Sequence, residues 1–413
     1  MTTDSFPDAI AYLRSPVAIR ERCGYLFDLA CADQLPSFRV DLTRLQPTAE
    51  YVLQVIRANY PTLEVPFHSR WRHFEVGGMT RLTQFNEQLR HLPPRDRAKA
   101  KFDLAIISVL LDAGAGAAWQ YAEAATGQVF QRSEGLAVAS FQMFMDGLFA
   151  SDRTSLQVDA IALQSLTLAD LANGFQVSAT NPLVGLEGRL QLLHQLGTVL
   201  TQHPDRFGIH PARPGHLVDY LLQHTHNHQL PAAVVLNAIL TGLGDIWPGR
   251  LTLNGVNLGD VWSHSALSDR HFPALPGLVP FHKLSQWLTY SLLEPLQELG
   301  LTITGFDELT GLPEYRNGGL CIDLGLLQVK EPAILQQPQT VDSDAIVEWR
   351  ALTVISLDRI AATIRQTLGL TADTLPLVKV LQGGTWTAGR KIAATLRSGG
   401  VPPIAIESDG TVF

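Results

Sequence analysis

The sequence has few cysteines, few charged residues and no long apolar run, and each shortage excludes a class of protein. Its three cysteines have no C-x-x-C spacing, which argues against a disulfide framework and against a zinc ribbon. Charged residues make up 17% of the chain and sum to a net charge of −8, so no bulk attraction to nucleic acid or to an anionic membrane is expected. The longest apolar run near the middle, Leu104 to Leu111, is far too short to span a membrane.

What is present is a globular composition, with 46% hydrophobic residues and no low-complexity linker. A chain of 413 residues can bury a large core. We expect one continuous globular unit over residues 1–413, with an N-terminal region at 1–100 packed on a helical core at 101–413. The segment from Met1 to Asp8 carries acids and no apolar stretch, unlike a signal peptide, and we expect a cytoplasmic protein. Nothing in the pattern indicates an oligomeric state.

Helical periodicity dominates the chain. After the cap residues Asp342 and Ser343, apolar side chains recur on one face, and Gly369 suits the end of this helix. The same spacing occurs in three further segments, 185–201, 217–243 (broken near 231) and 281–299. Strand patterns are short: one at 175–179, and one hairpin at 404–413 with its turn at 408–410. The predicted fold is mainly α, with a few short β-hairpins.

Three motifs resemble ligand sites but fail in their details. At 114–119, Trp119 stands where a dinucleotide-binding turn needs its third glycine, and Asp112 would repel a pyrophosphate. At 384–391 the glycine spacing resembles a phosphate loop, but the lysine is displaced by one position and no Ser or Thr follows it. The histidines at 224, 226 and 228 have no carboxylate or cysteine nearby, which favours a solvated loop over a metal site.

Three other groups of side chains suit chemistry. Arg70 and Arg72 lie among histidines and aromatics, a combination that fits an anion site and an amphipathic surface stretch equally well. Glu314 follows a proline and precedes basic and amide residues, so it is either a reactive carboxylate in a tight turn or an acid at a helix start. Glu348 and Arg350 are two apart on a helix and do not share a face, so one of them should point inward.

Several strings along the chain carry a family resemblance: Phe38 to Asp41, Pro66 to Glu75, Arg132 to Leu136, Leu309 to Leu320, Val347 to Leu352, Gly383 to Arg390 and Glu407 to Phe413. They resemble those of the uracil-catabolism family, formerly described as a domain of unknown function. The resemblance runs from about Tyr12 to the last residue. One departure is Gln382, where the resemblance leads us to expect a glutamate.

In the order of its features the chain is also distantly similar to the queuosine-phosphate N-glycosylase (queuosine salvage) family, which is helical and similar to DNA glycosylases. The residues that align are, in chain order, Asp112 with Trp119, Pro313 to Arg316, Glu348 with Arg350, and Trp386. In that family an aspartate stands at the position of Glu314, so the longer glutamate changes the reach of the carboxylate.

The two resemblances together imply a hydrolase that cleaves the N-glycosidic bond of ribosylurea, as its 5'-phosphate, and releases urea and ribose phosphate. The substrate would be a small ribosyl molecule, and neither a metal nor an organic cofactor is expected. Two alternatives remain open: a uracil nucleotide transferase or ring-opening enzyme, and a non-catalytic partner in the same pathway.

Cleavage of the C1'–N bond develops positive charge on the sugar, so a carboxylate is needed near C1'. We expect Glu314 to supply it, and Glu348 or Asp112 to hold the ribose hydroxyls or the attacking water. Arginines are the candidates for a 5'-phosphate, and the tryptophans for walls that exclude water. The substrate-binding candidates are Tyr315, Arg316, Asn317, Arg350, Trp119, Trp386, Arg390, Arg70, Arg72 and Glu134.

Overall fold

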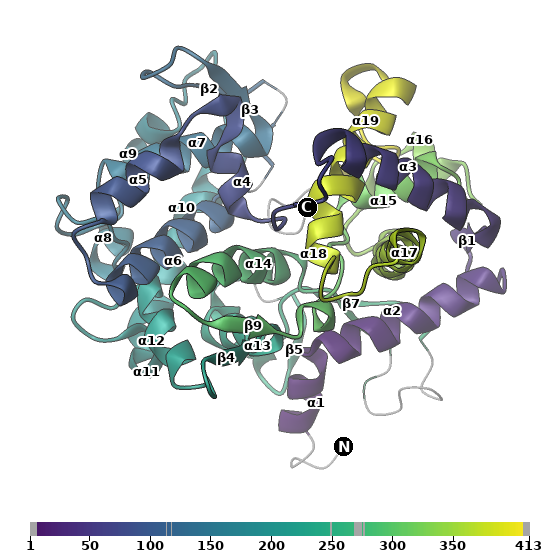
Figure 1. The fold of residues 1–413 in the computed structure, drawn as a ribbon, viewed down its shortest axis with the longest axis horizontal. Helices are drawn as coiled ribbons and strands as arrows, with labels where there is room; N and C mark the ends of the chain where they lie inside the picture. Colours follow the sequence, from purple (N-terminus) through teal and green to yellow (C-terminus); the bar gives the residue numbers. More distant parts are fainter. Residues whose placement is uncertain are drawn as a thin grey trace. The chain divides into compact units, whose positions relative to one another are not determined.

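The computed structural model describes residues 6–112, 114–116, 118–247, 250–267, 275 and 277–407. Over these residues the chain is mainly α, with strands only in short pairs, so the predicted fold class is confirmed (Figure 1). Backbone contacts group the chain into two compact units. The first unit comprises residues 1–68, 249–286 and 305–413, and the second comprises 69–248 and 287–304. The organisation as one continuous globular unit stays a prediction.

The helices of the first unit are α1 (Phe6–Leu13), α2 (Pro16–Cys31), η2 (Leu42–Arg44), α3 (Leu45–Asn59), η6 (Phe306–Glu308), α15 (Tyr315–Asp323), α16 (Ala333–Gln336), α17 (Asp344–Leu368), α18 (Leu377–Val380), η7 (Leu381–Thr385), α19 (Trp386–Leu396) and η8 (Ser398–Gly400). Its strands are β1 (Phe38–Val40), β5 (Thr252–Leu253), β6 (Val256–Asn257), β7 (Val261–Ser263), β8 (Leu278–Pro280), β10 (Leu327–Val329), β11 (Gln339–Thr340) and β12 (Ile406–Glu407). They pair as β1–β10, β5–β6 and β7–β8, all antiparallel, and as β11–β12, which is parallel.

The helices of the second unit are α4 (Arg70–Phe74), η3 (Val76–Gly78), α5 (Arg81–Leu89), α6 (Pro94–Leu110), α7 (Arg132–Met145), α8 (Ala160–Ser165), α9 (Leu168–Gly174), α10 (Leu186–Gln202), α11 (Pro204–Phe207), η4 (Pro214–His216), α12 (Leu217–Leu222), α13 (Ala232–Gly242) and η5 (Gly244–Ile246). Its strands are β2 (Gln120–Ala122), β3 (Val129–Gln131), β4 (Gln229–Pro231) and β9 (Thr302–Thr304), paired as β2–β3 and β4–β9. Helix α14 (Lys283–Glu298) begins in the first unit and continues into the second.

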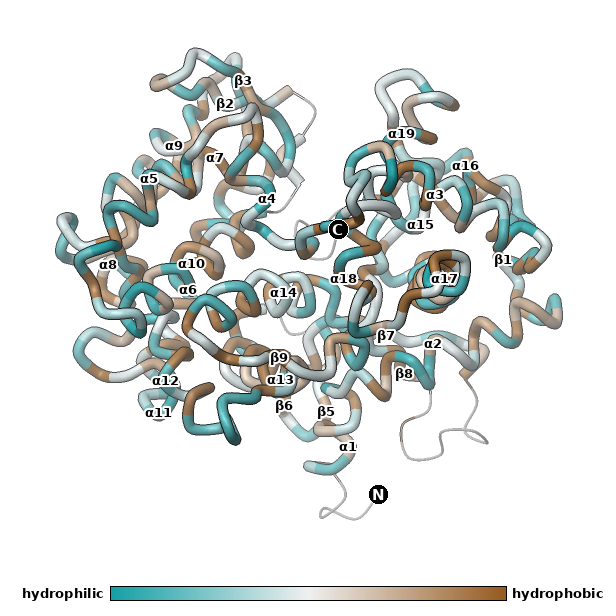
Figure 2. The backbone as a smooth tube through the Cα atoms, in the orientation of Figure 1, coloured by the Kyte–Doolittle hydropathy of each residue, from teal (hydrophilic) through white to brown (hydrophobic). Residues whose placement is uncertain are grey.

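Helix α17 is the central element of the first unit. Ser343 caps it by accepting the amide N–H of Ile346, and Gly369 ends it in the left-handed conformation at φ 68°, as predicted. Helices α2, α3 and α15 pack around it, and most of its residues are buried. Figure 2, in which α17 is viewed nearly end-on, shows hydrophobic residues next to hydrophilic ones in this helix. Burial on several sides explains why its sequence carries few charges in the middle.

The other helix predictions are confirmed in part, and one strand prediction is wrong. Helices α10 and α14 form as expected, and the segment 217–243 is α12 and α13 with strand β4 between them. The predicted strand at 175–179 does not form: Gln176 has φ 56°, which breaks an extended run, and only Ser178 makes a bridge, to Asn181. Of the predicted C-terminal hairpin, 406–407 form β12 and pair with β11 instead, while 408–413 lie outside the described residues.

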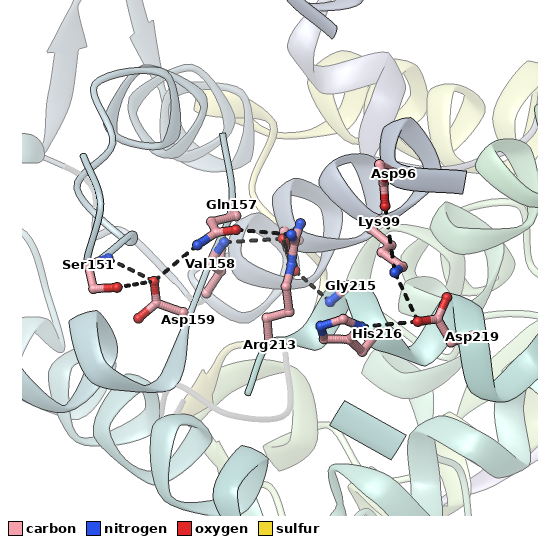
Figure 3. A network of polar contacts seen from close by, with 11 residues as sticks. Asp96, Lys99, Ser151, Gln157, Val158, Asp159, Arg213, Gly215, His216 and Asp219 are labelled. Carbon is pink, nitrogen blue, oxygen red and sulfur yellow. Dashed lines mark hydrogen bonds and ion pairs between the residues drawn. The ribbon is translucent and has the colours of Figure 1, made fainter. Parts of the chain in front are cut away.

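A network of buried polar contacts joins α6 to two loops of the second unit (Figure 3). Asp103 of α6 is fully buried and accepts a hydrogen bond from Arg213 Nε at 2.9 Å and one from the amide N–H of Val158 at 3.2 Å. Arg213 Nη1 also donates to Gln157 Oε1 at 3.0 Å, while Asp159 caps α8. Because these groups satisfy one another, we assign the network to the stability of the second unit.

Candidate functional site

Glu314 is held rigidly at the start of α15. It is the N-cap residue, and its two carboxylate oxygens accept the amide N–H groups of Arg316 (2.7 Å) and Asn317 (2.6 Å). Of the two alternatives for Glu314, the acid at a helix start therefore describes its local structure. The side chain is nevertheless only 8% exposed, which is unusual for a surface cap. Burial raises the pKa of this carboxyl above the ordinary glutamate value, although both amide hydrogen bonds and the charge of Lys283 oppose the shift. A buried carboxyl with a raised pKa is suited to proton transfer or to stabilising a cation.

Lys283 is the cation of this site that the sequence patterns did not single out. The positive charge of Lys283 lowers the pKa of Glu314 and the pKa of His68. Both groups therefore lie within electrostatic range of Lys283. The start of α14 positions it, since its amide N–H donates to Asp260 Oδ2 at 2.9 Å. No spacing in the sequence links these three residues, because they come from three distant segments.

Arg350 already has a protein partner. Its guanidinium donates to both carboxylate oxygens of Asp260 at 2.8 Å and lies 4.1 Å from the centre of the Phe281 ring. Asp260 also accepts Trp262 Nε1–H at 2.6 Å. Burial opposes ionisation of Asp260, but the charge and hydrogen bonds of Arg350 hold its pKa well below the usual range. Arg350 therefore holds Asp260, which in turn binds the start of α14 at Lys283, and we do not include Arg350 among the phosphate-binding groups.

Glu348 is fully buried inside the first unit. Its Oε2 accepts the amide N–H groups of Ser37 (3.2 Å) and Phe38 (3.1 Å), and its Oε1 lies 3.4 Å from Nε2 of the buried His264. Both Glu348 and Arg350 are thus buried, whereas one inward side chain was expected. Since Glu348 anchors the backbone ahead of β1, we do not include it among the groups that meet substrate.

The residues beside Glu314 mainly support its turn. Arg316 is 7% exposed and donates from Nη1 to the carbonyl of Gly400 at 2.6 Å. Asn317 is fully buried and donates from Nδ2 to the carbonyl of Leu312 at 3.0 Å. Tyr315 is half-buried, and the guanidinium of Arg316 lies 5.0 Å from its ring centre. Of these three predicted substrate contacts, Tyr315 has the most open side chain.

A single turn of π-helix, η7, connects α18 to α19 in the same unit. Gly383 and Gly384 lie within it, where a Cβ atom would approach Val65 Cγ1 at 2.8 Å and Val52 Cγ1 at 2.5 Å, respectively. The glycines therefore allow the turn to pack closely on α3 and on the segment that follows it. Such turns are frequent at functional sites, since they redirect the side chains around them. This turn carries Gln382 and leads into Trp386 and Arg390.

Replacing Gly384 with Ala should destabilise the protein by about 1–3 kcal/mol, because the new methyl group overpacks against Val52 and Ile56. The matched control is Gly24→Ala in the middle of α2, where a Cβ meets nothing within 4 Å and helix propensity predicts a gain of about 0.5–1 kcal/mol. Urea denaturation of both variants measures the difference. Equal stability of the two variants would contradict the packing role of Gly384.

His68, Trp386 and Arg390 lie together around this turn. The ring centres of His68 and Trp386 are 5.9 Å apart, and the guanidinium of Arg390 lies 4.9 Å from the Trp386 ring centre. His68 is 5% exposed, Trp386 is half-buried and Arg390 is exposed. Trp386 and Arg390 thus supply an aromatic face and a cation in the first unit, and their predicted contacts with a phosphorylated sugar stay a prediction.

The remaining candidates belong to the second unit. Arg70 is fully buried, 3.0 Å from Asp112, whose carboxylate also accepts from Ser133 Oγ at 2.6 Å. Arg72 pairs with Glu294 at 3.0 Å, and Glu134 is a half-buried acid within electrostatic range of Arg70.

Trp119 is a core residue of the second unit. It is fully buried and donates from Nε1 to the carbonyl of Phe175 at 2.9 Å. This environment accounts for Trp119 without a ligand, and we do not assign it to a pocket wall.

Comparison with known proteins identifies the family of this chain. Residues 12–413 match the family model described as "Protein of unknown function (DUF1688)". The chain belongs to this family. DUF1688 relatives include "Uracil catabolism protein 4" of Lachancea kluyveri, 37% identical over all of both chains. "Protein urg3" of Schizosaccharomyces pombe is 38% identical over 98% of this chain and 99% of its own length. The predicted resemblance to the uracil-catabolism family is confirmed, and the more distant similarity to queuosine salvage proteins stays a prediction.

The described part of this DUF1688 protein contains no helix that is long and apolar enough to cross a membrane. Among the same residues, no group of three or more His, Cys, Asp or Glu side chains could hold a metal ion. The histidines at 224, 226 and 228 lie in an exposed loop, as their spacing predicted.

Proposed function

We propose that this protein acts in uracil catabolism by hydrolysing the N-glycosidic bond of ribosylurea, as its 5'-phosphate. The name of the Lachancea relative supports the pathway, because that protein is similar to this chain over its full length. The observation that carries the reaction is the buried carboxyl of Glu314, fixed by two backbone amides within electrostatic range of a lysine. Such an arrangement suits a reaction that develops positive charge on a sugar.

In the proposed reaction the C1'–N bond breaks, the oxygen of water bonds to C1', and one water proton ends on the leaving urea nitrogen. Ionised Glu314 stabilises the cationic sugar and accepts the proton of the attacking water. Its anchoring at the N-terminus of α15 keeps the carboxylate from rotating away, so little reorganisation is needed during the reaction. Lys283 supplies a positive charge that balances the ionised acid before substrate binds.

The substrate's 5'-phosphate is assigned to Arg390. Arg316 and Arg350 are only 7% and 1% exposed, whereas Arg390 is exposed beside the ring of Trp386, where a phosphate can reach it. An arginine is well suited to a phosphate because its planar fork offers two parallel N–H donors. Trp386 would cover one face of the sugar and exclude water from it.

The direct test is to incubate the purified full-length protein with ribosylurea 5'-phosphate and to measure released urea with a urease-coupled assay. We expect catalytic release of urea, faster from the phosphorylated substrate than from ribosylurea itself. Absence of urea release from both compounds, at protein concentrations near that of the substrate, would overturn the proposal. Uridine monophosphate in a parallel reaction tests the transferase and ring-opening alternatives.

The pH dependence of kcat/KM should reflect the raised pKa of the buried Glu314. Since the ionised form is required and burial disfavours it, kcat/KM should fall as pH falls through the raised pKa of Glu314. The midpoint of this acid limb should therefore lie above the ordinary glutamate value of about 4.3. Steady-state rates between about pH 4 and pH 8 measure it. A rate that stays constant down to the ordinary glutamate pKa would show that a buried acid does not control the reaction.

A further inference from the structure

The buried ring of His68 forms a hydrogen bond with the half-buried Gln382 of the π-helical turn. Nδ1 of His68 lies 2.9 Å from Gln382 Oε1, and because an amide oxygen only accepts, the ring donates from Nδ1. The backbone of His68 is held as well, since its N–H donates to the carbonyl of Val378 at 3.1 Å. In a neutral ring with its proton on Nδ1, Nε2 is an acceptor.

The pair is held in one geometry by its surroundings. The neighbouring glycines of η7 pack on Val52 and Val65 with no room for a side chain, which fixes the backbone of the turn that carries Gln382. The ring of Trp386 lies next to that of His68 and limits its rotation. The tautomer of His68 is therefore determined by the residue at position 382.

The charges around His68 favour the neutral ring. Burial and, to a smaller extent, the positive charge of Lys283 lower the pKa of His68 to about 4, although the hydrogen bond to Gln382 raises it. Lys283 also acts on Glu314, which is the acid of the same site, and Arg390 lies on the neighbouring Trp386. A neutral His68 adds no further positive charge to a site that already contains the acid Glu314 and the cations Lys283, Arg316 and Arg390.

We propose that Gln382 is a positioning residue that fixes the proton of His68 on Nδ1 and, as an amide, adds no negative charge that would pair with a charged imidazole, in the site that contains Glu314 and Lys283. The inference rests on the proposed function, because a sugar that becomes positively charged is disfavoured by every additional cation nearby. A carboxylate at position 382 would instead pair with a protonated imidazole and favour a charged His68. The choice of an amide over an acid at this position thus sets the charge of the site.

The test is Gln382→Glu, an isosteric change that adds a carboxylate facing Nδ1. Nitrogen-15 NMR of the imidazole should show neutral, Nδ1-protonated His68 in the parent protein at pH 7, and an upward pKa shift of about two units or more in the variant. Gln382→Leu removes the acceptor and should lose the preference for Nδ1–H. Gln366→Glu, which adds the same charge at an exposed position of α17, should leave His68 unchanged.

The activity measurement separates this inference from the proposed function. Compared with the parent protein, urea release by Gln382→Glu should be about tenfold lower near pH 5 and should recover as pH rises through the new pKa of His68, a recovery that a folding defect would not produce. A parent His68 that is charged or Nε2-protonated at pH 7 overturns the positioning role, whatever the activity. A parent protein that releases no urea, with the NMR shifts as expected, overturns the proposed reaction and leaves the control of His68 by Gln382 standing.

Discussion

Glu314→Gln should lower the rate of urea release by about 1,000-fold, because the amide cannot stabilise a cationic sugar or accept a proton from water. The change is nearly isosteric, and the amide oxygen can still accept one of the two amide N–H groups at the start of α15. We therefore expect the folded structure to persist, with a loss of stability of about 1 kcal/mol from the weakened cap. Rates under substrate saturation and a urea-denaturation curve measure the two effects separately.

The matched control is Ser343→Ala, which removes the N-cap of α17. It should cost a similar amount, about 1 kcal/mol, but leave the reaction rate within a factor of about two, because Ser343 is not assigned to the chemistry. Near-normal turnover by Glu314→Gln would remove Glu314 from the mechanism. Loss of activity in both variants would instead point to helix capping as the cause.

Asp260→Asn should destabilise the protein by about 3 kcal/mol, because it leaves the buried guanidinium of Arg350 without a compensating charge. Arg350 is 1% exposed, so water cannot replace the lost carboxylate. The variant also weakens the acceptors of Trp262 Nε1–H and of the Lys283 amide, which fix the start of α14. The shift in the midpoint of urea denaturation, at unchanged slope, measures the loss.

The control for this prediction is Asp358→Asn, which breaks the more open pair between Asp358 and Arg20, with 27% and 30% of the side chains exposed. It should cost less than about 1 kcal/mol, because solvent screens the pair. If both variants lost the same free energy of unfolding, the stabilising role of the buried ion pair between Arg350 and Asp260 would be contradicted.

At acidic pH, the difference in the free energy of unfolding between the parent protein and Asp260→Asn should become smaller. The folded-state pKa of Asp260 is lowered by Arg350, so its contribution is complete above the unfolded value of about 3.9 and is lost as pH falls below it. The stability gap should therefore be constant from about pH 5 to pH 8 and shrink only in stronger acid. Denaturation curves at several pH values test this.

Local structure was largely predictable from the sequence, and the helix of residues 344–368 illustrates why. Its cap at Ser343, its apolar period and its terminating Gly369 are all properties of near neighbours in the chain. The segment 175–179 shows the limit of such patterns, because alternating residues predicted a strand while the positive φ of Gln176 prevents one. An alternation of five residues does not outweigh the surrounding packing.

The roles of individual charged residues were much less predictable. Glu314 and Glu348 were both candidates, but one caps a helix at the site and the other anchors the backbone of Ser37 and Phe38 inside the core. Nothing in the sequence around either residue distinguishes these roles, since the backbone amides that Glu348 accepts are more than 300 residues away.

The sequence by itself determined the family, the mainly helical fold class and the central helix with both of its ends. These properties depend on composition and on residues a few positions apart, which a single chain displays directly. Only the tertiary structure decided which arginines already have partners, that Lys283 acts on Glu314, and that Gln382 faces His68. The physical reason is that burial, partnership and charge depend on segments brought together by folding, and no spacing along the chain encodes that proximity.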